Sequence, residues 1–157
     1  MSSTKDKLDA TGIPKEKFLS VRFVISLLLV LAGIAWIVFQ YTVVRVDPIA
    51  AVTDGAKPGG PKWVDDIGLW SYCIGFGLLM VGLATAAHPS TPLGRGRGVV
   101  VGMLGCFLLG MIWICTFYVF QNQTLDSIWV MNDLGNYNIL VGIAFLAVGF
   151  TYATKWE

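Results

Sequence analysis

The sequence predicts an all-helical integral membrane protein with four transmembrane helices, arranged as two repeated helical hairpins with both termini in the cytoplasm. The 157 residues are 55% hydrophobic and only 13% charged, whereas soluble domains carry about a quarter charged residues. The apolar residues fall in four continuous runs, each long enough to cross roughly 30 Å of hydrocarbon. Strands are not expected, because the runs do not alternate and an open sheet cannot satisfy its edge groups in lipid.

The predicted elements follow the alternation of polar and apolar stretches. The first residues are polar and mixed in charge, which is typical of a mobile tail. The four spans are expected at residues 23–41, 67–87, 99–120 and 134–154. The outer loop at 42–65 is rich in proline and glycine and is expected to be irregular. We therefore divide the chain into a cytoplasmic tail (1–17), a first hairpin (18–87), a cytoplasmic link (88–98) and a second hairpin (99–157).

The basic residues set the expected orientation. Three of them, Arg45, Lys57 and Lys62, lie in the long outer loop. The other eight lie at the opposite ends of the spans and are Lys5, Lys7, Lys15, Lys17, Arg22, Arg95, Arg97 and Lys155. Because cytoplasmic segments carry the excess of Lys and Arg, both termini are predicted to lie inside. Tyr152, near the inner end of the last span, is interpreted as part of the aromatic belt at the membrane surface.

The first half of the chain recurs in the second half. Residues 66–86 and 133–153 share seven of 21 positions at an offset of 67, and residues 21–41 and 98–118 share seven of 21 at an offset of 77. The shared residues include three glycines and an aspartate, and a tryptophan that stands at positions 36 and 113. Unrelated apolar helices would share mainly Leu and Val, so we infer a duplication. Each unit crosses the membrane twice, so the copies are expected to be related by a pseudo-twofold axis along the membrane normal.

Glycines recur every seven residues in the second arm of each hairpin. They are Gly68, Gly75 and Gly82 in the first copy and Gly135, Gly142 and Gly149 in the second. Seven residues are close to two helical turns, so each set is expected along one helix face. Small residues let membrane helices approach closely. We interpret these glycines, with Trp36 and Trp113, as candidates for helix packing or partner contact. Packing within a hairpin, packing between the copies and self-association of the chain all remain open.

Polar residues mark the outer mouth of the fourth span. Asp133 stands where an aspartate can cap backbone N–H groups and favour the positive end of the helix dipole, as does Asp66 in the first copy. Asn136 and Asn138 follow within the next turn. Their side chains are expected either to bond across helices, for roughly 0.6 to 2 kcal/mol each, or to face a periplasmic partner. The sequence does not rank these two alternatives.

The chain shows no pattern typical of catalysis or metal binding. The three cysteines lie inside apolar runs, and the single histidine, His88, stands in the proline-flanked link. No nucleophile–base pair and no metal-ligand spacing is present in the sequence. We therefore predict no catalytic residue, no metal and no cofactor. The net charge of +1 gives no indication of nucleic acid as a partner, and the expected surroundings are membrane lipid.

A small oligomeric pore or a transporter-like protein is the alternative function. A proton-coupled transporter normally needs an ionisable residue inside the membrane. The four expected spans contain no Asp, Glu, Lys, Arg or His between their ends. A pore formed by several copies is harder to exclude, but the few hydroxyl groups in the spans do not form a polar stripe along any one helix.

The second half resembles a known family. Residues 110–120 read G-M-I-W-I-C-T-F-Y-V-F, residues 132–142 read N-D-L-G-N-Y-N-I-L-V-G, and the chain ends in T-K-W-E. A Gly-x-x-Trp helix that ends in aromatic residues, a polar loop, this glycine-bearing helix and a short basic end with a Trp are similar to the CrgA-type cell division proteins of actinobacteria. The first half resembles the family more loosely. The chain is therefore expected to be a tandem version of a two-helix unit.

The resemblance implies a non-catalytic protein of the division machinery in the plasma membrane, enriched at the septum. It would coordinate septum formation with peptidoglycan synthesis through contacts with the tubulin-like protein FtsZ and septal peptidoglycan synthases. The matching residues are Trp113, Asp133, Gly135, Asn136, Asn138, Gly142, Gly149 and Trp156. In the first copy Leu69 and Ser71 replace the two asparagines and Pro89 replaces the terminal Trp, so that copy is expected to lack part of this surface.

Overall fold

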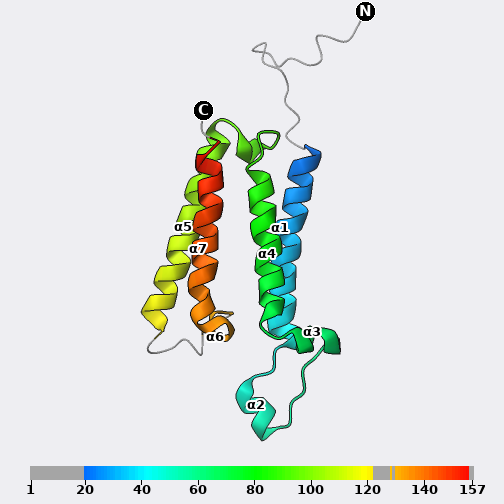
Figure 1. Cartoon of the computed structure of the whole chain (residues 1–157). Coiled ribbons are helices and arrows are strands. Elements are labelled where there is room, and N and C mark those ends of the chain that lie inside the picture. The colour runs from blue at the N-terminus through cyan, green and yellow to red at the C-terminus, as the bar shows by residue number, and fades with distance from the viewer. Residues whose placement is uncertain (1–19, 122–127, 129, 156–157) are drawn as a thin grey trace, which may run out of the picture.

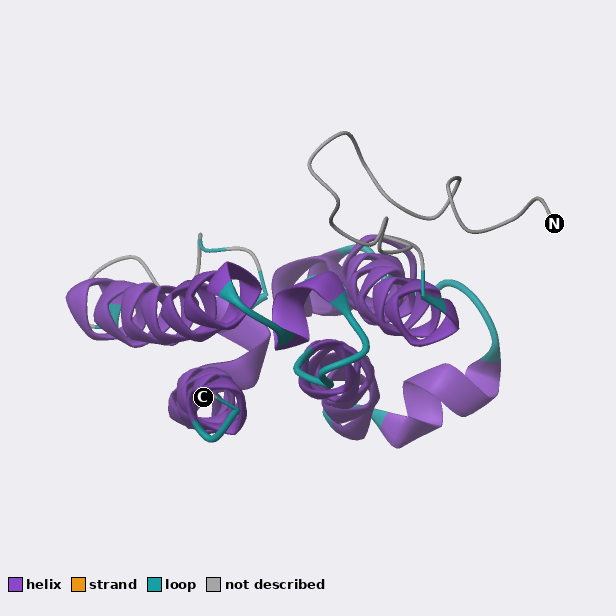
Figure 2. Ribbon diagram, turned by 90° about the horizontal axis from the view of Figure 1, so that it is seen from above, coloured by secondary structure: helices purple, strands orange, loops and turns teal. Residues whose placement is uncertain are grey.

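The structure is a computed structural model that describes residues 20–121, 128 and 130–155. Within this part of the chain every regular element is a helix and no strand occurs (Figure 2). The expected all-helical class is therefore confirmed.

The first hairpin is built from two long helices joined by a connecting segment. α1 spans Val21–Phe39 and begins where the hydroxyl of Ser20 accepts a hydrogen bond of 3.2 Å from the backbone N–H of Phe23. It continues as a π-helical turn, Gln40–Val44. The connecting segment contains two short helices, α2 (Pro48–Thr53) and α3 (Lys62–Ile67), so the expectation of an irregular loop at 42–65 is wrong. The return helix α4 spans Trp70–Ala86.

The second hairpin begins after a single 3-10 turn, Pro92–Gly94. Its first arm is α5, Arg97–Phe120. The second arm consists of α6 (Met131–Leu134), a 3-10 turn (Gly135–Tyr137) and α7 (Asn138–Ala153). The fourth span was expected to be regular from residue 134, but α7 begins only at Asn138, because Gly135 takes a φ of 49° that no α-helix accommodates.

Three segments in the described part of the chain are long and apolar enough to cross a membrane. They are Val21–Val44, Arg97–Phe120 and Met131–Ala153, of 24, 24 and 23 residues. α4 is apolar but has only 17 residues. Many large apolar side chains point outward; Val101 and Phe150 are 64% and 63% exposed. This is the distribution expected of helices whose outer surface meets lipid rather than water.

The four long helices pair within each hairpin. α1 packs along α4 and α5 packs along α7, and the two hairpins meet where α4 contacts α7 (Figure 1). Two apolar clusters fill this junction. One contains Ile37, Tyr72 and Phe145, and the other contains Ala86, Val148 and Tyr152. The start of α1, the end of α7 and the link between the hairpins lie at one end of the bundle, and α2, α3 and α6 lie at the other (Figure 1).

Candidate functional site

The two arms of each hairpin cross at a pair of glycines. A Cβ atom added to Gly33 would lie 2.6 Å from the backbone oxygen of Gly75, and one added to Gly110 would lie 2.8 Å from the backbone oxygen of Gly142. The two pairs are related by the sequence offsets of 77 and 67. Because backbone meets backbone at both crossings, any side chain there would force the helices apart. The same crossing is thus built twice.

The next glycine along each return helix also faces its own hairpin. A Cβ on Gly82 would lie 2.8 Å from Val30 Cγ2, and one on Gly149 would lie 2.6 Å from Phe107 Cδ1. Val30 and Phe107 are again related by the offset of 77. The structure therefore places these glycines in contacts within a hairpin rather than between the copies.

The remaining two glycines of the seven-residue pattern have a different place. Gly68 ends α3 with a φ of 56°, and Gly135 ends α6 with a φ of 49°. A Cβ on either would meet no atom within 4 Å, so neither lies in a helix contact. Positive φ is the conformation that glycine adopts without steric cost. At these two positions the repeat conserves a turn and not a packing face.

Asp133 joins the two hairpins at the end of the bundle that carries α2, α3 and α6 (Figure 1). Its Oδ1 lies 2.6 Å from Arg45 Nε, and the hydroxyl of Tyr72 donates to its Oδ2 at 2.6 Å. The expectation that Asp133 and Asp66 cap helices is wrong. The N-cap residues of α4 and α7 are Leu69 and Tyr137, and neither makes a side-chain cap hydrogen bond. Asp66 lies exposed within α3.

The Arg45–Asp133 pair is partly shielded from solvent. The two side chains are 19% and 16% exposed, and the guanidinium carbon of Arg45 lies 4.9 Å from the centre of the Tyr41 ring. Burial acts to lower the pKa of Arg45, but the hydrogen bond and the charge of Asp133 outweigh it and the net direction is upward. Arg45 therefore keeps its charge beside Asp133, and the contact between them ties the end of α1 to α6. Sequence reasoning missed Arg45 and Tyr72, for which the only signal was a lone arginine directly after an apolar span.

The tryptophans at positions 36 and 113 have different surroundings in the two copies. Trp36 Nε1 donates to the backbone oxygen and the hydroxyl of Ser71, at 3.0 and 3.1 Å, and Ser71 in turn donates to Gln40 Oε1 at 2.9 Å. Trp113 packs edge-on against Phe76 of the other hairpin, with ring centres 5.7 Å apart. Its buried Nε1 has no partner among the described residues. Phe117 stands where the first copy has Gln40.

The two asparagines of the second copy are separated by the fold. Asn138 is fully buried, and its Nδ2 donates to the backbone oxygens of Met131 and Gly135 at 2.8 and 2.7 Å. It therefore holds the turn between α6 and α7 and neither crosses to another long helix nor faces outward. Its Oδ1 has no partner among the described residues. Asn136 is exposed. Trp156 lies outside the residues that the structure describes.

We expect Trp36→Phe to destabilise the protein more than the equivalent change Trp113→Phe. Both substitutions remove an indole, but only the first breaks hydrogen bonds and leaves the buried Ser71 with fewer partners. The difference should be about 1 kcal/mol. Thermal unfolding of the two purified variants in the same detergent measures it, with the wild type as reference. Equal losses would show that the bonds of Trp36 contribute nothing to stability.

The arrangement has the character of a contact site. The described residues contain no group of three His, Cys, Asp or Glu side chains close enough to hold a metal ion. Arg45, Tyr72 and Asp133 are bonded to one another across the hairpin junction. Together with the apolar exterior, these features define the class: a helical membrane protein in which two similar glycine-crossed hairpins are docked side by side.

Comparison with known families agrees with this class and identifies the family. The sequence model of the family described as cell division protein CrgA matches residues 3–89 and, a second time, residues 84–157. The chain therefore belongs to the CrgA family of cell division proteins. A cell division protein CrgA of Streptomyces avermitilis is 40% identical over 65 residues, which cover 41% of this chain and 71% of that relative. No solved structure matches the chain.

Proposed function

We propose that this protein is a tandem CrgA unit, in which residues 18–87 and 99–157 form two hairpins that cross the membrane four times. The observation that carries the proposal is the double occurrence of one architecture. The family model matches each half, and the glycine crossing at Gly33 and Gly75 recurs at Gly110 and Gly142. A shared origin of the halves explains why both the sequence and the backbone contact repeat.

Of the four proposed crossings, α4 is the one for which helix length gives the least support. An α-helix of 17 residues is roughly 26 Å long, slightly less than the hydrocarbon core. Bilayers accommodate such a deficit by thinning locally, at a modest cost. α4 also packs along the whole of α1 in the same way as α7 packs along α5 (Figure 1). With the excess of basic residues at the opposite end from α3, this arrangement supports cytoplasmic termini.

The proposed role in division is carried by contacts and not by chemistry or conduction. Five of the six serine and threonine hydroxyl groups inside the expected spans are already bonded: Ser26 to Phe23, Ser71 to Gln40, Thr85 to Gly82, Thr151 to Val148 and Thr154 to Thr151. Hydroxyls bonded within their own hairpin do not line a polar path, which disfavours the pore. By family, the partners are FtsZ on the cytoplasmic side and septal peptidoglycan synthases.

The outer ends of the two hairpins offer different contact surfaces. Asn136 is exposed and Tyr137 is 56% exposed at the outer end of the second hairpin. The equivalent positions of the first hairpin are Leu69 and Trp70, which are 48% and 73% exposed. Exposed aromatic groups are frequent anchors of protein interfaces. We propose that these two patches contact different periplasmic partners, the polar one being the surface that the family shares.

A fluorescent fusion at the N-terminus tests location and orientation together. We expect enrichment at new septa in dividing cells, with a fluorophore that matures only in the cytoplasm. A fusion of the same fluorophore to a membrane protein with a periplasmic N-terminus serves as the control and should stay dark. Uniform membrane fluorescence, with normal division after deletion of the gene, would contradict the division role. A dark N-terminal fusion in full-length protein would contradict the proposed orientation.

A further inference from the structure

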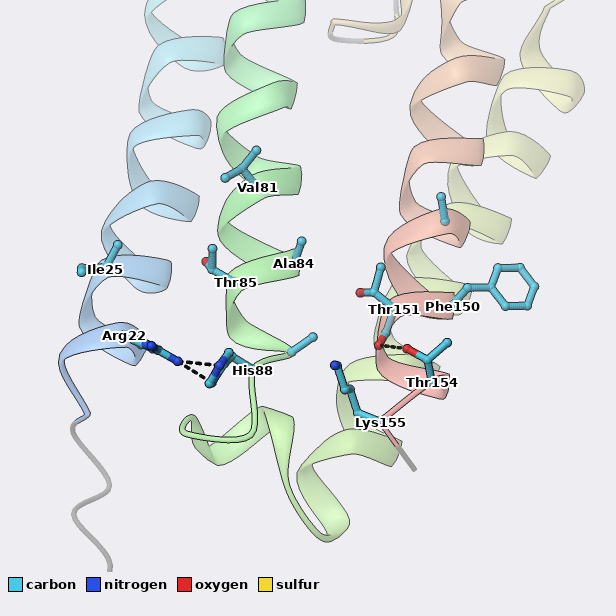
Figure 3. A pocket seen from close by; sticks show the side chains of 12 residues that line it. Arg22, Ile25, Val81, Ala84, Thr85, His88, Phe150, Thr151, Thr154 and Lys155 are labelled. Atoms are coloured by element: carbon cyan, nitrogen blue, oxygen red, sulfur yellow. Dashed lines mark hydrogen bonds between the residues drawn. The ribbon is translucent and has the colours of Figure 1, made fainter. Parts of the chain in front are cut away.

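A large groove opens at the inner end of the bundle, between the two hairpins. It has a volume of about 840 Å³ and lies between α1 and α4 on one side and α7 on the other (Figure 3). Its walls are apolar and include Ile25, Val81 and Phe150, which are 48%, 53% and 63% exposed. A space of this size, walled by outward-facing side chains of proposed membrane helices, can hold much of an acyl chain.

The internal repeat shows why this groove is open: the residues that fill the equivalent space in the second copy are different residues here. The position equivalent to Thr85, which lines the groove, is Tyr152 in the second copy, and the position equivalent to Ile25 is Gly102. Tyr152 packs over Gly102, is 1% exposed, and donates a hydrogen bond of 2.8 Å to the backbone oxygen of Leu83. On that side of the junction a closed apolar cluster stands where the equivalent groove would be. The expectation that Tyr152 belongs to an aromatic belt is therefore wrong.

Positive groups stand at the inner mouth of the groove. Arg22 and Lys155 both line it, and the guanidinium of Arg22 lies against the imidazole of His88, with Nη1 3.0 Å from Nδ1 (Figure 3). His88 is itself fixed by the backbone N–H of Ser90, which donates to Nδ1 at 3.1 Å. None of the described residues that line the groove is acidic. Within the part of the chain that the structure describes, two cations therefore flank one end of an apolar groove without a carboxylate between them.

We propose that this groove binds an anionic phospholipid of the inner leaflet. Its acyl chain lies between α4 and α7, and its phosphate lies between Arg22 and Lys155. Basic pockets between membrane helices on the cytoplasmic side are characteristic sites for anionic headgroups. The inference rests on the proposed four-span topology, because that topology places the groove in lipid and its charged end at the cytoplasmic surface.

The shape of the groove distinguishes this occupant from others. A free phosphate would use the two cations but not the apolar walls, and a neutral lipid would use the walls but not the cations. A second copy of the chain would place apolar helix surface against Arg22 and Lys155 and would leave these two charges without an opposite charge. Of these occupants, only an anionic lipid uses both the apolar walls and the two cations.

Native mass spectrometry of the full-length protein in detergent tests the proposal. The protein is incubated with phosphatidylglycerol or with phosphatidylcholine of the same acyl chains, and separately with glycerol 3-phosphate. We expect one phosphatidylglycerol to be retained per chain in strong preference to phosphatidylcholine. Glycerol 3-phosphate should not displace the retained lipid. Each cation should account for roughly a fivefold preference.

Three variants and one control locate the site. Arg22→Gln and Lys155→Gln should each lower the preference for phosphatidylglycerol roughly fivefold. Thr85→Tyr copies the residue that closes the opposite side and should abolish retention. Arg97→Gln removes an exposed cation at the same end of the bundle, outside the groove, and should leave retention unchanged. The two glutamine variants change exposed side chains, so the test stands even where Thr85→Tyr fails to fold.

Several results would overturn the proposal. They are equal retention of both lipids, an equal loss in Arg97→Gln, displacement of the lipid by glycerol 3-phosphate, and a dimer mass with no lipid. Retention in detergent depends neither on septal location nor on orientation. Septal fluorescence without a lipid preference would therefore overturn this inference alone, and retained phosphatidylglycerol with uniform membrane fluorescence would overturn the division role alone.

Discussion

Replacing Gly33 or Gly110 with leucine is expected to separate the two arms of the hairpin that contains it. The Cβ atom alone would meet backbone at both sites, at 2.6 Å from Gly75 O and 2.8 Å from Gly142 O, and backbone cannot rotate away as a side chain can. Overpacking typically costs about 1–3 kcal/mol, and these sites should lie at the upper end or beyond. The melting temperature in detergent should fall by roughly 5–10 °C.

Glycines of the same helices provide matched controls. Gly105 in α5 and Gly77 in α4 have no atom within 4 Å of an added Cβ, so leucine at either position should leave the melting temperature unchanged. Leucine at Gly149 should have an intermediate effect, because the atoms that it would meet belong to the ring of Phe107, which can move. A loss for Gly105→Leu as large as that for Gly110→Leu would contradict the crossing.

Asp133→Asn is expected to weaken the docking of the two hairpins at the end of the bundle that carries α2, α3 and α6. The amide keeps the size of the carboxylate but removes the charge that faces Arg45 and one of the two acceptors that serve Arg45 and Tyr72. Loss of a hydrogen bond to a charged group costs about 1.5–3 kcal/mol, and partial exposure of this pair places the expected loss near the lower value. Thermal unfolding of the full chain measures it.

The internal repeat again supplies the control. Asp66→Asn changes the equivalent, exposed aspartate of the first copy and should be neutral. A double-mutant cycle of Asp133→Asn and Arg45→Gln isolates the pairwise energy, which should be favourable. Simple additivity of the two single changes would contradict a direct interaction between these side chains.

The two copies share their glycine contacts and turns but differ in the polar side chains attached to them. The glycine crossings and the glycine turns recur, because both depend on close backbone approach or on a positive φ. The polar groups attached to them do not recur. Ser71 bonds Gln40 and Trp36 within the first hairpin, whereas Asp133 of the second reaches into the first. A duplicated hairpin can diverge in this way, since each copy keeps its own packing.

Sequence reasoning located the spans and the repeat because both are properties of local composition. Long apolar runs and shared glycines are visible without any knowledge of which helices touch. Sequence reasoning misjudged α3 and the start of α7. There, short helices end at Gly68 and Gly135 with positive φ angles that the sequence pattern does not reveal. It also treated Asp133 as a cap, because the nearest backbone N–H groups were the only partners that position in the sequence could suggest.

The sequence by itself determined the helical membrane class, the family and the duplication. Each of these follows from the hydropathy, spacing or identity of residues along the sequence. In lipid, few structures other than a helix can satisfy the backbone polar groups. The tertiary structure alone decided that the glycines at 75, 82, 142 and 149 pack within hairpins, that Arg45 meets Asp133, and that Tyr152 closes one groove while Thr85 leaves the other open. These contacts join residues far apart in the chain, and the relative placement of two packed hairpins fixes them.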